Sequence, residues 1–178
     1  MRGFLHMMFA ILAGVAAGWI SAVSLIENYG FEAVAGQPQW HERRNASDHP
    51  AAPYAFGYFI NQGQVPPPLT SRHFVRSTDD DGAQLRSDCI YQVAGKMPPA
   101  RRWSMAILLG EGTVSTLGAG ETVFEPDGSV RVELSSQPVP GNRLTLPGSG
   151  APLLSLTIHD PAESDAPLSL PGVAKVRC

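Results

Sequence analysis

The chain has 178 residues, which is the length of a single domain. Glycine (18 residues) and proline (16 residues) are frequent but follow no period, which excludes a collagen-like chain. Only 16% of the residues are charged and the net charge is −3, so the chain lacks the basic surface that nucleic-acid binding needs. Its two cysteines are too few for a disulfide-dense scaffold or a four-cysteine zinc site.

The hydropathy pattern divides the chain into three parts. Residues 1–27 form an apolar N-terminal segment, and residues 28–70 form a polar juxtamembrane segment with one short helix. Residues 71–178 contain short strands separated by turn signals. We therefore predict a mainly β protein, an antiparallel and jelly-roll-like β-sandwich, with an N-terminal transmembrane helix.

The N-terminal segment is predicted to be a membrane anchor. Between Phe4 and Ile26 it contains no Asp, Glu, Lys or Arg. A helix of about 23 residues is ~34 Å long, which is enough to cross a hydrocarbon core of ~30 Å. The alternative is a cleaved signal peptide, with Arg2 in a short basic region and a cleavage pattern at Ile20-Ser21-Ala22. Because the apolar run continues beyond that pattern, an uncleaved anchor is favoured.

The charges that flank this segment predict its orientation. Arg2 precedes the span and Glu27 follows it, and basic residues tend to remain on the cytoplasmic side of a membrane. Both alternatives for the N-terminus export the rest of the chain. We therefore expect a single-pass protein of the inner (plasma) membrane with a periplasmic C-terminal domain.

Small residues recur at every fourth position of the span, at Ala10, Gly14, Gly18 and Ala22. On a helix they form one ridge, and the G-x-x-x-G from Gly14 to Gly18 allows a second helix to approach closely. We expect helix packing at this ridge, in a homodimer or with a partner. The alternative is ordinary composition, because Gly and Ala are common in membrane helices.

The juxtamembrane segment is predicted to be irregular over residues 31–52, because it is polar and interrupted by Gly and Pro. Pro53 can open a short helix over Tyr54–Gln62. Trp40 stands alone in this polar region, and two placements remain open: docking on the β domain or resting at the membrane surface.

From Ser71 onwards, short runs in which apolar residues alternate with polar ones predict strands with one buried face. Asp81-Gly82 predicts a hairpin that joins strands over His73–Thr78 and Cys89–Ala94. Further strands are predicted over Arg102–Leu109, Ser129–Ser136 and Leu153–His159.

The sequence contains no specific catalytic, metal or phosphate motif, because G-x-S-x-G, S-x-x-K, H-E-x-x-H and the P-loop are all absent. Asp79-Asp80-Asp81-Gly82 lacks the alternating ligands and closing Glu of a calcium loop, so it predicts a charged turn. His73 and His159 lie in predicted strands and could converge, but a polar strand face explains both. We predict no catalytic residues, no metal site and no cofactor.

Arg101, Arg102 and Trp103 are the candidate ligand-binding residues. Two guanidinium groups beside an indole could bind a carboxylate or a phosphate. In the alternative interpretation Trp103 fills the core, the Arg102 stem lies along apolar surface, and Arg101 pairs with a carboxylate.

Cys89 and Cys178 are predicted to form a disulfide. Both lie in the exported part, where oxidation is favoured, and no other pairing is available within the chain. The bridge would hold the end of the chain against a predicted strand. The alternative is two free thiols, with Cys178 open to an intermolecular bridge.

A series of short motifs runs through most of the chain in a characteristic order. The densest are Cys89-x-Tyr91-x-Val93-x-Gly95 and Pro99-Ala100-Arg101-Arg102-Trp103; the others are Asn28-Tyr29-Gly30-Phe31, Ala35-Gly36-Gln37 with Trp40, Pro53-Tyr54, Asp80-Asp81-Gly82 with Leu85, Asp127-Gly128-Ser129, Gly141-Asn142, Leu170-Pro171 and Cys178. In this order they resemble the small membrane-anchored members of the bacterial family called domain of unknown function 1214. The resemblance implies a β-sandwich-like fold and a protein partner from the sister family, domain of unknown function 1254, but no established reaction.

The chain departs from this family pattern in two places. Arg143-Leu144-Thr145-Leu146-Pro147 follows Gly141-Asn142, where the family tends to have Trp-Leu-Pro. Thr157-Ile158-His159 precedes Asp160-Pro161, where the family tends to have Arg and an aromatic residue. Any pocket that those positions form in the family is altered here.

Three functions are compatible with these features. We favour a membrane-anchored periplasmic envelope protein of unknown biochemical activity, an interaction module that works with a partner protein. The second is a domain that binds a small ligand, a carbohydrate or a lipid. The third is a cryptic envelope hydrolase with carboxylates such as Asp88, Glu121 or Glu133 as acid and base. Because no catalytic motif is present, we expect a protein that is not an enzyme.

Overall fold

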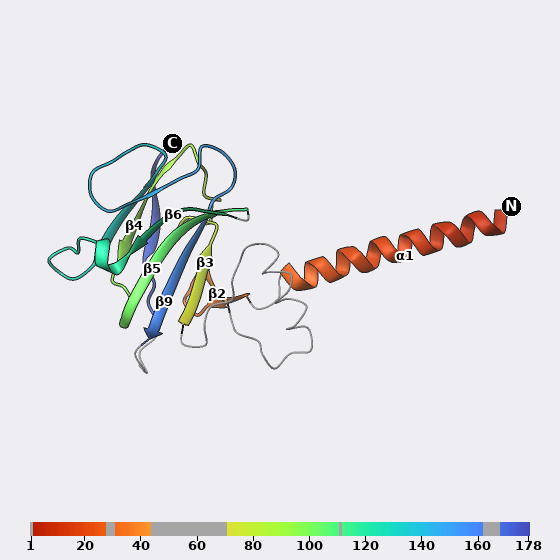
Figure 1. The fold of residues 1–178 in the computed structure, drawn as a ribbon, viewed down its shortest axis with the longest axis horizontal. Coiled ribbons are helices and arrows are strands. Elements are labelled where there is room, and N and C mark those ends of the chain that lie inside the picture. Colours follow the sequence, from red (N-terminus) through yellow and green to blue (C-terminus); the bar gives the residue numbers. More distant parts are fainter. Residues whose placement is uncertain (1, 28–30, 44–70, 111, 162–167) are drawn as a thin grey trace.

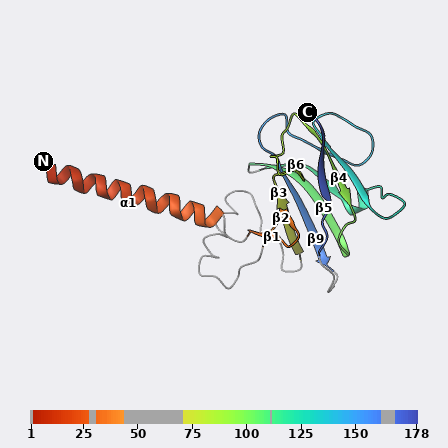
Figure 2. The ribbon, with the colours of Figure 1, turned by 180° about the vertical axis from the view of Figure 1, so that it is seen from behind.

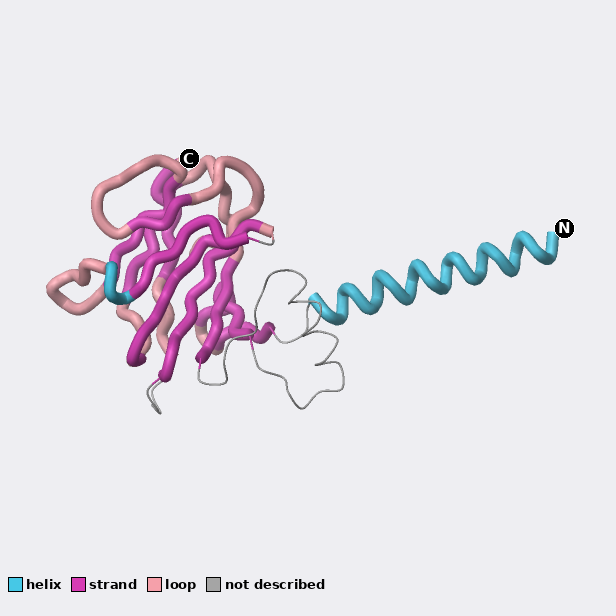
Figure 3. Tube along the Cα trace, viewed as in Figure 1, coloured by secondary structure: helices cyan, strands magenta, loops and turns pink. Residues whose placement is uncertain are grey.

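Residues 2–27, 31–43, 71–110, 112–161 and 168–178 are described in the computed structural model of the chain. These residues form one long helix and a β domain of two sheets, which confirms the predicted fold class (Figure 1). Strands make up most of the described β domain, and loops join them at its ends (Figure 3).

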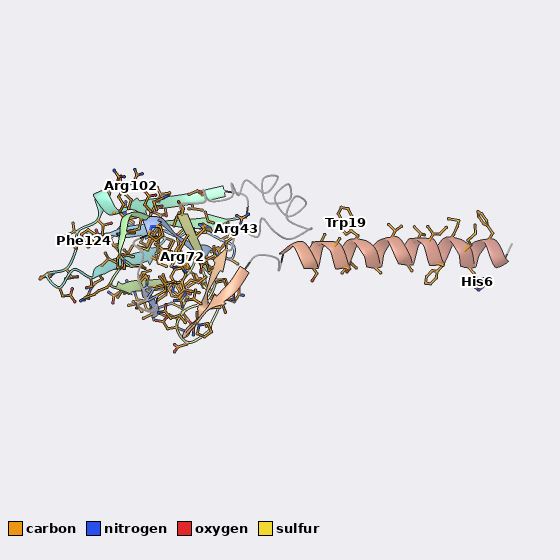
Figure 4. All side chains as sticks on the ribbon, turned by 90° about the horizontal axis from the view of Figure 1, so that it is seen from below. His6, Trp19, Arg43, Arg72, Arg102 and Phe124 are labelled. Atoms are coloured by element: carbon orange, nitrogen blue, oxygen red, sulfur yellow. A yellow bond between two sulfur atoms is a disulfide. The ribbon has the colours of Figure 1, made fainter. Side chains whose placement is uncertain are left out.

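The helix α1 (Arg2–Glu27) has apolar side chains on all sides. Its span His6–Ser24 has a mean hydropathy of 1.9 and buries none of its residues. Phe9 and Trp19 are each more than 70% exposed (Figure 4). The helix is long and apolar enough to cross a membrane, as a membrane anchor or a signal sequence does.

The larger sheet has six antiparallel strands in the order β1-β2-β3-β9-β5-β6. Figure 2 shows β1 and β2 side by side next to β3 at one edge of this sheet. The strands are β1 (Phe31–Val34), β2 (Gln37–Arg43), β3 (Ser71–Arg76), β5 (Ala100–Leu109), β6 (Gly112–Gly118) and β9 (Leu153–Pro161).

The smaller sheet has four strands in the order β10-β4-β7-β8, and only its β7–β8 pair is parallel. A single 3-10 turn, η1 (Ala119–Glu121), follows β6 of the larger sheet. The strands of the smaller sheet are β4 (Ile90–Gly95), β7 (Val130–Ser135), β8 (Arg143–Thr145) and β10 (Gly172–Arg177).

The two sheets pack face to face around one apolar core. Successive side chains of a strand point to opposite sides, so the apolar half of each alternating run faces the other sheet. Met105 of β5, Leu156 of β9 and Val132 of β7 are fully buried there. The alternation read from the sequence for β7 and β9 is confirmed, as is the strand predicted over Arg102–Leu109.

The predicted hairpin at Asp81-Gly82 is wrong, although the turn itself forms. Asp79 Oδ1 accepts hydrogen bonds from the backbone N–H groups of Asp81 (3.1 Å) and Ala83 (2.8 Å). However, β3 pairs with β2 and β9 in the larger sheet, whereas β4 pairs with β10 and β7 in the smaller one. The turn residues determine a local reversal of the chain, but they do not determine which strands pair beyond it.

The predicted irregular segment is wrong for residues 31–43. Gly36, with a φ of 76°, allows a tight turn between β1 and β2, and β2 extends the larger sheet by pairing with β3. The β domain therefore includes residues on both sides of the boundary predicted at residue 70. The predicted short helix over Tyr54–Gln62 lies outside the described residues.

Trp40 of β2 docks on the β domain. Its side chain is 1% exposed, and its indole N–H donates a hydrogen bond to the carbonyl oxygen of Pro171 at 3.0 Å. The buried guanidinium of Arg76 lies 5.3 Å from the Trp40 ring centroid and donates to Thr78 O and Asp80 Oδ1. These contacts join β2 and β3 of the larger sheet to the chain that enters β10.

Cys89 and Cys178 form a disulfide with a Cα–Cα distance of 4.0 Å, which confirms the predicted pairing. The bridge joins the residue before β4 to the residue after β10. β10 is an edge strand and pairs only with β4, so the disulfide holds its free end.

Removal of this disulfide should destabilise the β domain strongly. The bridge closes a loop with a sequence separation of 89 residues. Chain-entropy theory assigns a stabilisation of about 4–5 kcal/mol to a loop of this size. Urea unfolding of the full-length protein in detergent, followed by tryptophan fluorescence, should show a much lower midpoint for Cys89→Ser/Cys178→Ser. The reduced wild type should match the double variant, and equal midpoints with and without reductant would contradict the prediction.

Candidate functional site

One polar surface built by the strands is the outer face of the larger sheet, the side that points away from the core. Its residues alternate along each strand with the core residues Phe74, Met105 and Leu156. It comprises His41 and Arg43 of β2, Ser71 and His73 of β3, Thr157 and His159 of β9, and Arg102 and Ser104 of β5.

Two imidazole–hydroxyl pairs cross from β3 to β9 on this face. The Ser71 hydroxyl lies 2.9 Å from Nδ1 of His159, and His73 Nδ1 lies 2.9 Å from the Thr157 hydroxyl. The members of each pair are directly opposite in the β3–β9 register, so the ladder itself holds the side chains together. His73 and His159 thus lie on one polar strand face, with each ring bound to a hydroxyl group.

The electrostatics of this face keep His73 neutral. Burial, together with the positive charge of Arg43, which lies opposite it on β2, lowers the pKa of His73 to about 4. Burial also lowers the pKa of the Arg43 guanidinium. An additional positive charge is therefore disfavoured next to His73 and Arg43.

The Ser71–His159 pair has no carboxylate beside it on the described strands of this face. A catalytic imidazole needs a carboxylate or similar group to orient it and to stabilise its charge. Among the described strands β2, β3, β5 and β9, no Asp or Glu lies on the outer face. The described residues also contain no group of three or more His, Cys, Asp or Glu arranged to hold a metal ion.

An open groove of about 320 Å³ lies at the end of the outer face that carries Arg102. Arg102, Trp103 and Ser104 of β5 line it together with His159 of β9. Gly118, Ala119 and Gly120, at the end of β6 and in η1, complete its wall. A Cβ atom added at Gly118 or Gly120 would meet nothing within 4 Å, so the two glycines keep the groove open.

The three candidate ligand-binding residues do not form a single cluster. Because side chains alternate along β5, Arg101 and Trp103 point to one side of the sheet and Arg102 to the other. Trp103 is 6% exposed, fills the core and makes an edge-to-face contact with Phe124 at 6.4 Å between ring centroids. The structure places Arg102 and part of Trp103 at the groove and separates Arg101 from it.

The carboxylates suggested for acid–base chemistry lie on separate elements. Arg86 binds Asp88 through two hydrogen bonds of 2.9 and 2.6 Å and thereby lowers the pKa of the Asp88 carboxyl. Glu133 faces Gln92 on the neighbouring strand of the smaller sheet. Glu121 lies in η1 and accepts a long hydrogen bond of 3.4 Å from Gly118 N. They do not meet as an acid–base pair.

Sequence reasoning overlooked Ser104, His159 and the Gly118–Gly120 turn as groove residues. The alternation of β5 contained the signal for Ser104, because it lies two residues after Arg102 on the same face. Nothing in the sequence indicated that His159 faces Arg102, since that contact depends on the β5–β9 register.

No family model matches this chain, and no curated protein matches it. Two solved structures share its fold. The VPA0106 protein of Vibrio parahaemolyticus has 18% sequence identity and a TM-score of 0.58, over 92% of this chain and 43% of that chain. An uncharacterised protein of Burkholderia cenocepacia has 14% identity and a TM-score of 0.52, over 89% of this chain and 49% of that chain. The likeness establishes the fold alone, and this chain spans less than half the length of either protein.

Acid should destabilise the outer face through His73. The pKa of His73 is about 4 in the folded chain and 6.5 as the ordinary value, so between these limits the unfolded chain binds the extra proton. The free energy of unfolding should therefore fall as the pH falls from about 6.5 to about 4, by roughly 3 kcal/mol more in the wild type than in His73→Gln. Urea unfolding of the full-length protein in detergent across this pH range measures the difference.

His41→Gln is the matched control, because His41 is an exposed histidine of the same sheet. This variant should keep the wild-type pH dependence. Parallel pH curves for the wild type and His73→Gln would contradict the assignment of the effect to His73.

Proposed function

We propose that this chain is a single-pass protein of the bacterial inner membrane whose periplasmic β domain acts as an interaction module. The observation that carries the proposal is the apolar helix α1, whose span His6–Ser24 has no buried residue and which precedes a disulfide-bonded β domain. Large apolar side chains exposed along the whole of a helix are costly in water and favourable in lipid.

The short connection between α1 and the β domain supports a role at the membrane surface. Only residues 28–30 separate α1 from β1. Four Cα-to-Cα steps of about 3.8 Å span at most ~15 Å. The edge of the larger sheet formed by β1 and β2 is therefore tethered close to the end of α1.

The Cys89–Cys178 bridge supports export of the domain. Disulfides form and persist in the bacterial periplasm but are rare in the reducing cytoplasm. The flanking charges, Arg2 before the span and Glu27 after it, favour the same orientation.

The arginine partners of four carboxylates in the described part of the chain favour a binding protein over an enzyme. Glu42, Asp80, Asp88 and Glu125 each pair with an arginine on the domain surface, so they hold the fold instead of forming an acid–base site. We propose as partner a protein of the family called domain of unknown function 1254, which the resemblance implies, or a second copy of this chain.

Reporter fusions test the orientation. Alkaline phosphatase fused after Cys178 should be active in a bacterial inner-membrane host, because the enzyme needs the oxidising periplasm. A cytoplasmic reporter fused at the same place should be inactive. The opposite pair of results would reverse the proposed topology.

Substitution of Gly14 and Gly18 tests whether the chain associates through its helix. No atom lies within 4 Å of a Cβ added at either glycine, so this side of α1 is open to a second helix. Gly14→Ile/Gly18→Ile should weaken self-association or partner recovery in a membrane two-hybrid assay while insertion is unchanged.

Ala13→Ile/Ala17→Ile is the matched control for this pair. It has the same spacing and adds side chains of the same size about 100° further round the helix. Equal association of the two double variants would show that the ridge has no specific role in association and that its small residues reflect the ordinary composition of membrane helices.

A second function, the binding of a small ligand, is favoured by the groove at Arg102. Its volume of about 320 Å³ lies at the lower end of the range for small-molecule sites, roughly 300–1,000 Å³. The groove combines apolar wall with a few polar groups, which is the usual composition of such sites.

A further inference from the structure

We infer that the groove at Arg102 binds a small anion, a molecule with a carboxylate or phosphate group. This inference deepens the second proposed function, the binding of a small ligand, and rests on it. Three hydrogen-bond donors from two neighbouring strands converge on the groove: Arg102 and Ser104 of β5 and His159 of β9.

The register of the sheet brings these donors within reach of one ion. Arg102 and His159 are directly opposite each other in the antiparallel β5–β9 ladder. Directly opposite residues have Cα atoms about 4.5–5.5 Å apart. Ser104 lies two residues along β5 on the same face, about 7 Å further.

The guanidinium of Arg102 is available for a ligand. It is exposed at the surface of the larger sheet (Figure 4) and makes no ion pair or hydrogen bond with the described part of the chain. By contrast, Arg72, Arg76 and Arg86 each bind a carboxylate. A guanidinium suits a planar carboxylate or a phosphate, because it offers two parallel N–H donors.

The Ser71 hydroxyl engages Nδ1 of His159 at 2.9 Å, which leaves Nε2 as the ring nitrogen that can meet a ligand. When the Ser71 hydroxyl donates to Nδ1 of His159, the ring proton resides on Nε2. His159 lines the groove, and Nε2 has no partner within the described residues. In that tautomer Nε2 donates a hydrogen bond to an anion in the groove, next to the Arg102 guanidinium.

No carboxylate competes for these donors among the residues that line the groove. Glu121 is the nearest acidic residue along the chain from the Gly118–Gly120 wall, and its side chain accepts from Gly118 N instead of binding Arg102. The lining of the groove therefore contains Arg102 and no acidic residue, although the whole chain has a net charge of −3.

The shape of the groove limits the size of the ligand. Its volume of about 320 Å³ accommodates one anionic group with a small apolar body against Ala119. Such a group occurs both in free metabolites and in lipid head groups, so the experiment must distinguish these sources.

Isothermal titration of the full-length protein in neutral detergent, with inorganic phosphate and acetate as the probes, tests the inference. Arg102→Gln should weaken binding of the probe about ten- to hundred-fold, as expected when one charge-assisted hydrogen-bonding group is lost. Arg101→Gln is the matched control, because it removes the same charge one residue away on the opposite face, and it should leave the affinity unchanged.

Gly118→Leu closes the groove and should abolish binding. Gly118 has φ −100° and ψ 162°, which any residue adopts, and it is opposite Ser104 in the β5–β6 ladder. The new side chain therefore enters the groove without backbone strain. Glucose, a neutral probe, is titrated in parallel against the same three variants.

Three results would overturn the inference. Equal losses of anion affinity in Arg101→Gln and Arg102→Gln, or no loss in either, would show that the anion is not held in the groove. If glucose binds in a way that Gly118→Leu abolishes and Arg102→Gln does not, the groove binds ligands but is not an anion site. If Gly118→Leu alters the binding of none of the probes, both the inference and the proposed ligand-binding function fail.

A final arm identifies the source of the anion. The full chain is placed in nanodiscs of phosphatidylcholine with or without phosphatidylglycerol, and the phosphate affinity is measured in each. A weaker phosphate affinity in the anionic discs shows that lipid head groups occupy the groove, whereas equal affinities assign it to a water-soluble anion. The difference in phosphate affinity between the two kinds of nanodisc should disappear in Arg102→Gln and persist in Arg101→Gln.

Discussion

Trp40 holds the two sheets together at the edge of the domain that follows the helix. Its ring belongs to β2 of the larger sheet, yet its indole N–H binds the carbonyl of Pro171 at the start of β10 in the smaller sheet. Arg76 covers the ring, and Asp80 ties Arg76 to the turn that links the two sheets. Because a buried indole and a buried guanidinium must both find hydrogen-bond partners, this arrangement specifies one relative position of the sheets.

The disulfide completes this attachment at the other end of β10. The first residues of the strand are held by Trp40, and its last residue is followed by Cys178, which is bound to Cys89. An edge strand with one neighbour and a free end would otherwise fray. The domain thus depends on two attachments that are 131 and 89 residues apart in sequence, and neither arises from local structure.

The outer face of the larger sheet combines two kinds of polar surface. Between β3 and β9, His73 is neutral and is paired with Thr157. This hydrogen bond lies within the sheet. At the β5 end Arg102 retains donors for a ligand, and the glycines beside it leave space. The same antiparallel register produces both, because it places a hydroxyl opposite each histidine of β3 and β9 and an arginine opposite His159.

The sequence by itself determined the features that depend on local pattern. The apolar run determined α1, and the two-residue period determined the buried faces of β5, β7 and β9. The same period also implied that Arg101 and Arg102 point to opposite sides of β5, a consequence that the search for a cluster of neighbouring residues overlooked. The disulfide followed from the presence of only two cysteines in a chain that its apolar N-terminal segment predicts to be exported.

Only the tertiary structure decided which strands pair. The β1–β2 hairpin is polar and short, so its strands become stable only when β2 pairs with β3 and Trp40 is buried. The chain on either side of the Asp81-Gly82 turn enters different sheets, because burial of each apolar face in the common core outweighs the local preference for a hairpin. The groove depends on the contact between Arg102 and His159, which are far apart in sequence. Such a contact is fixed by strand register, a property of the whole sheet that no single segment of the chain encodes.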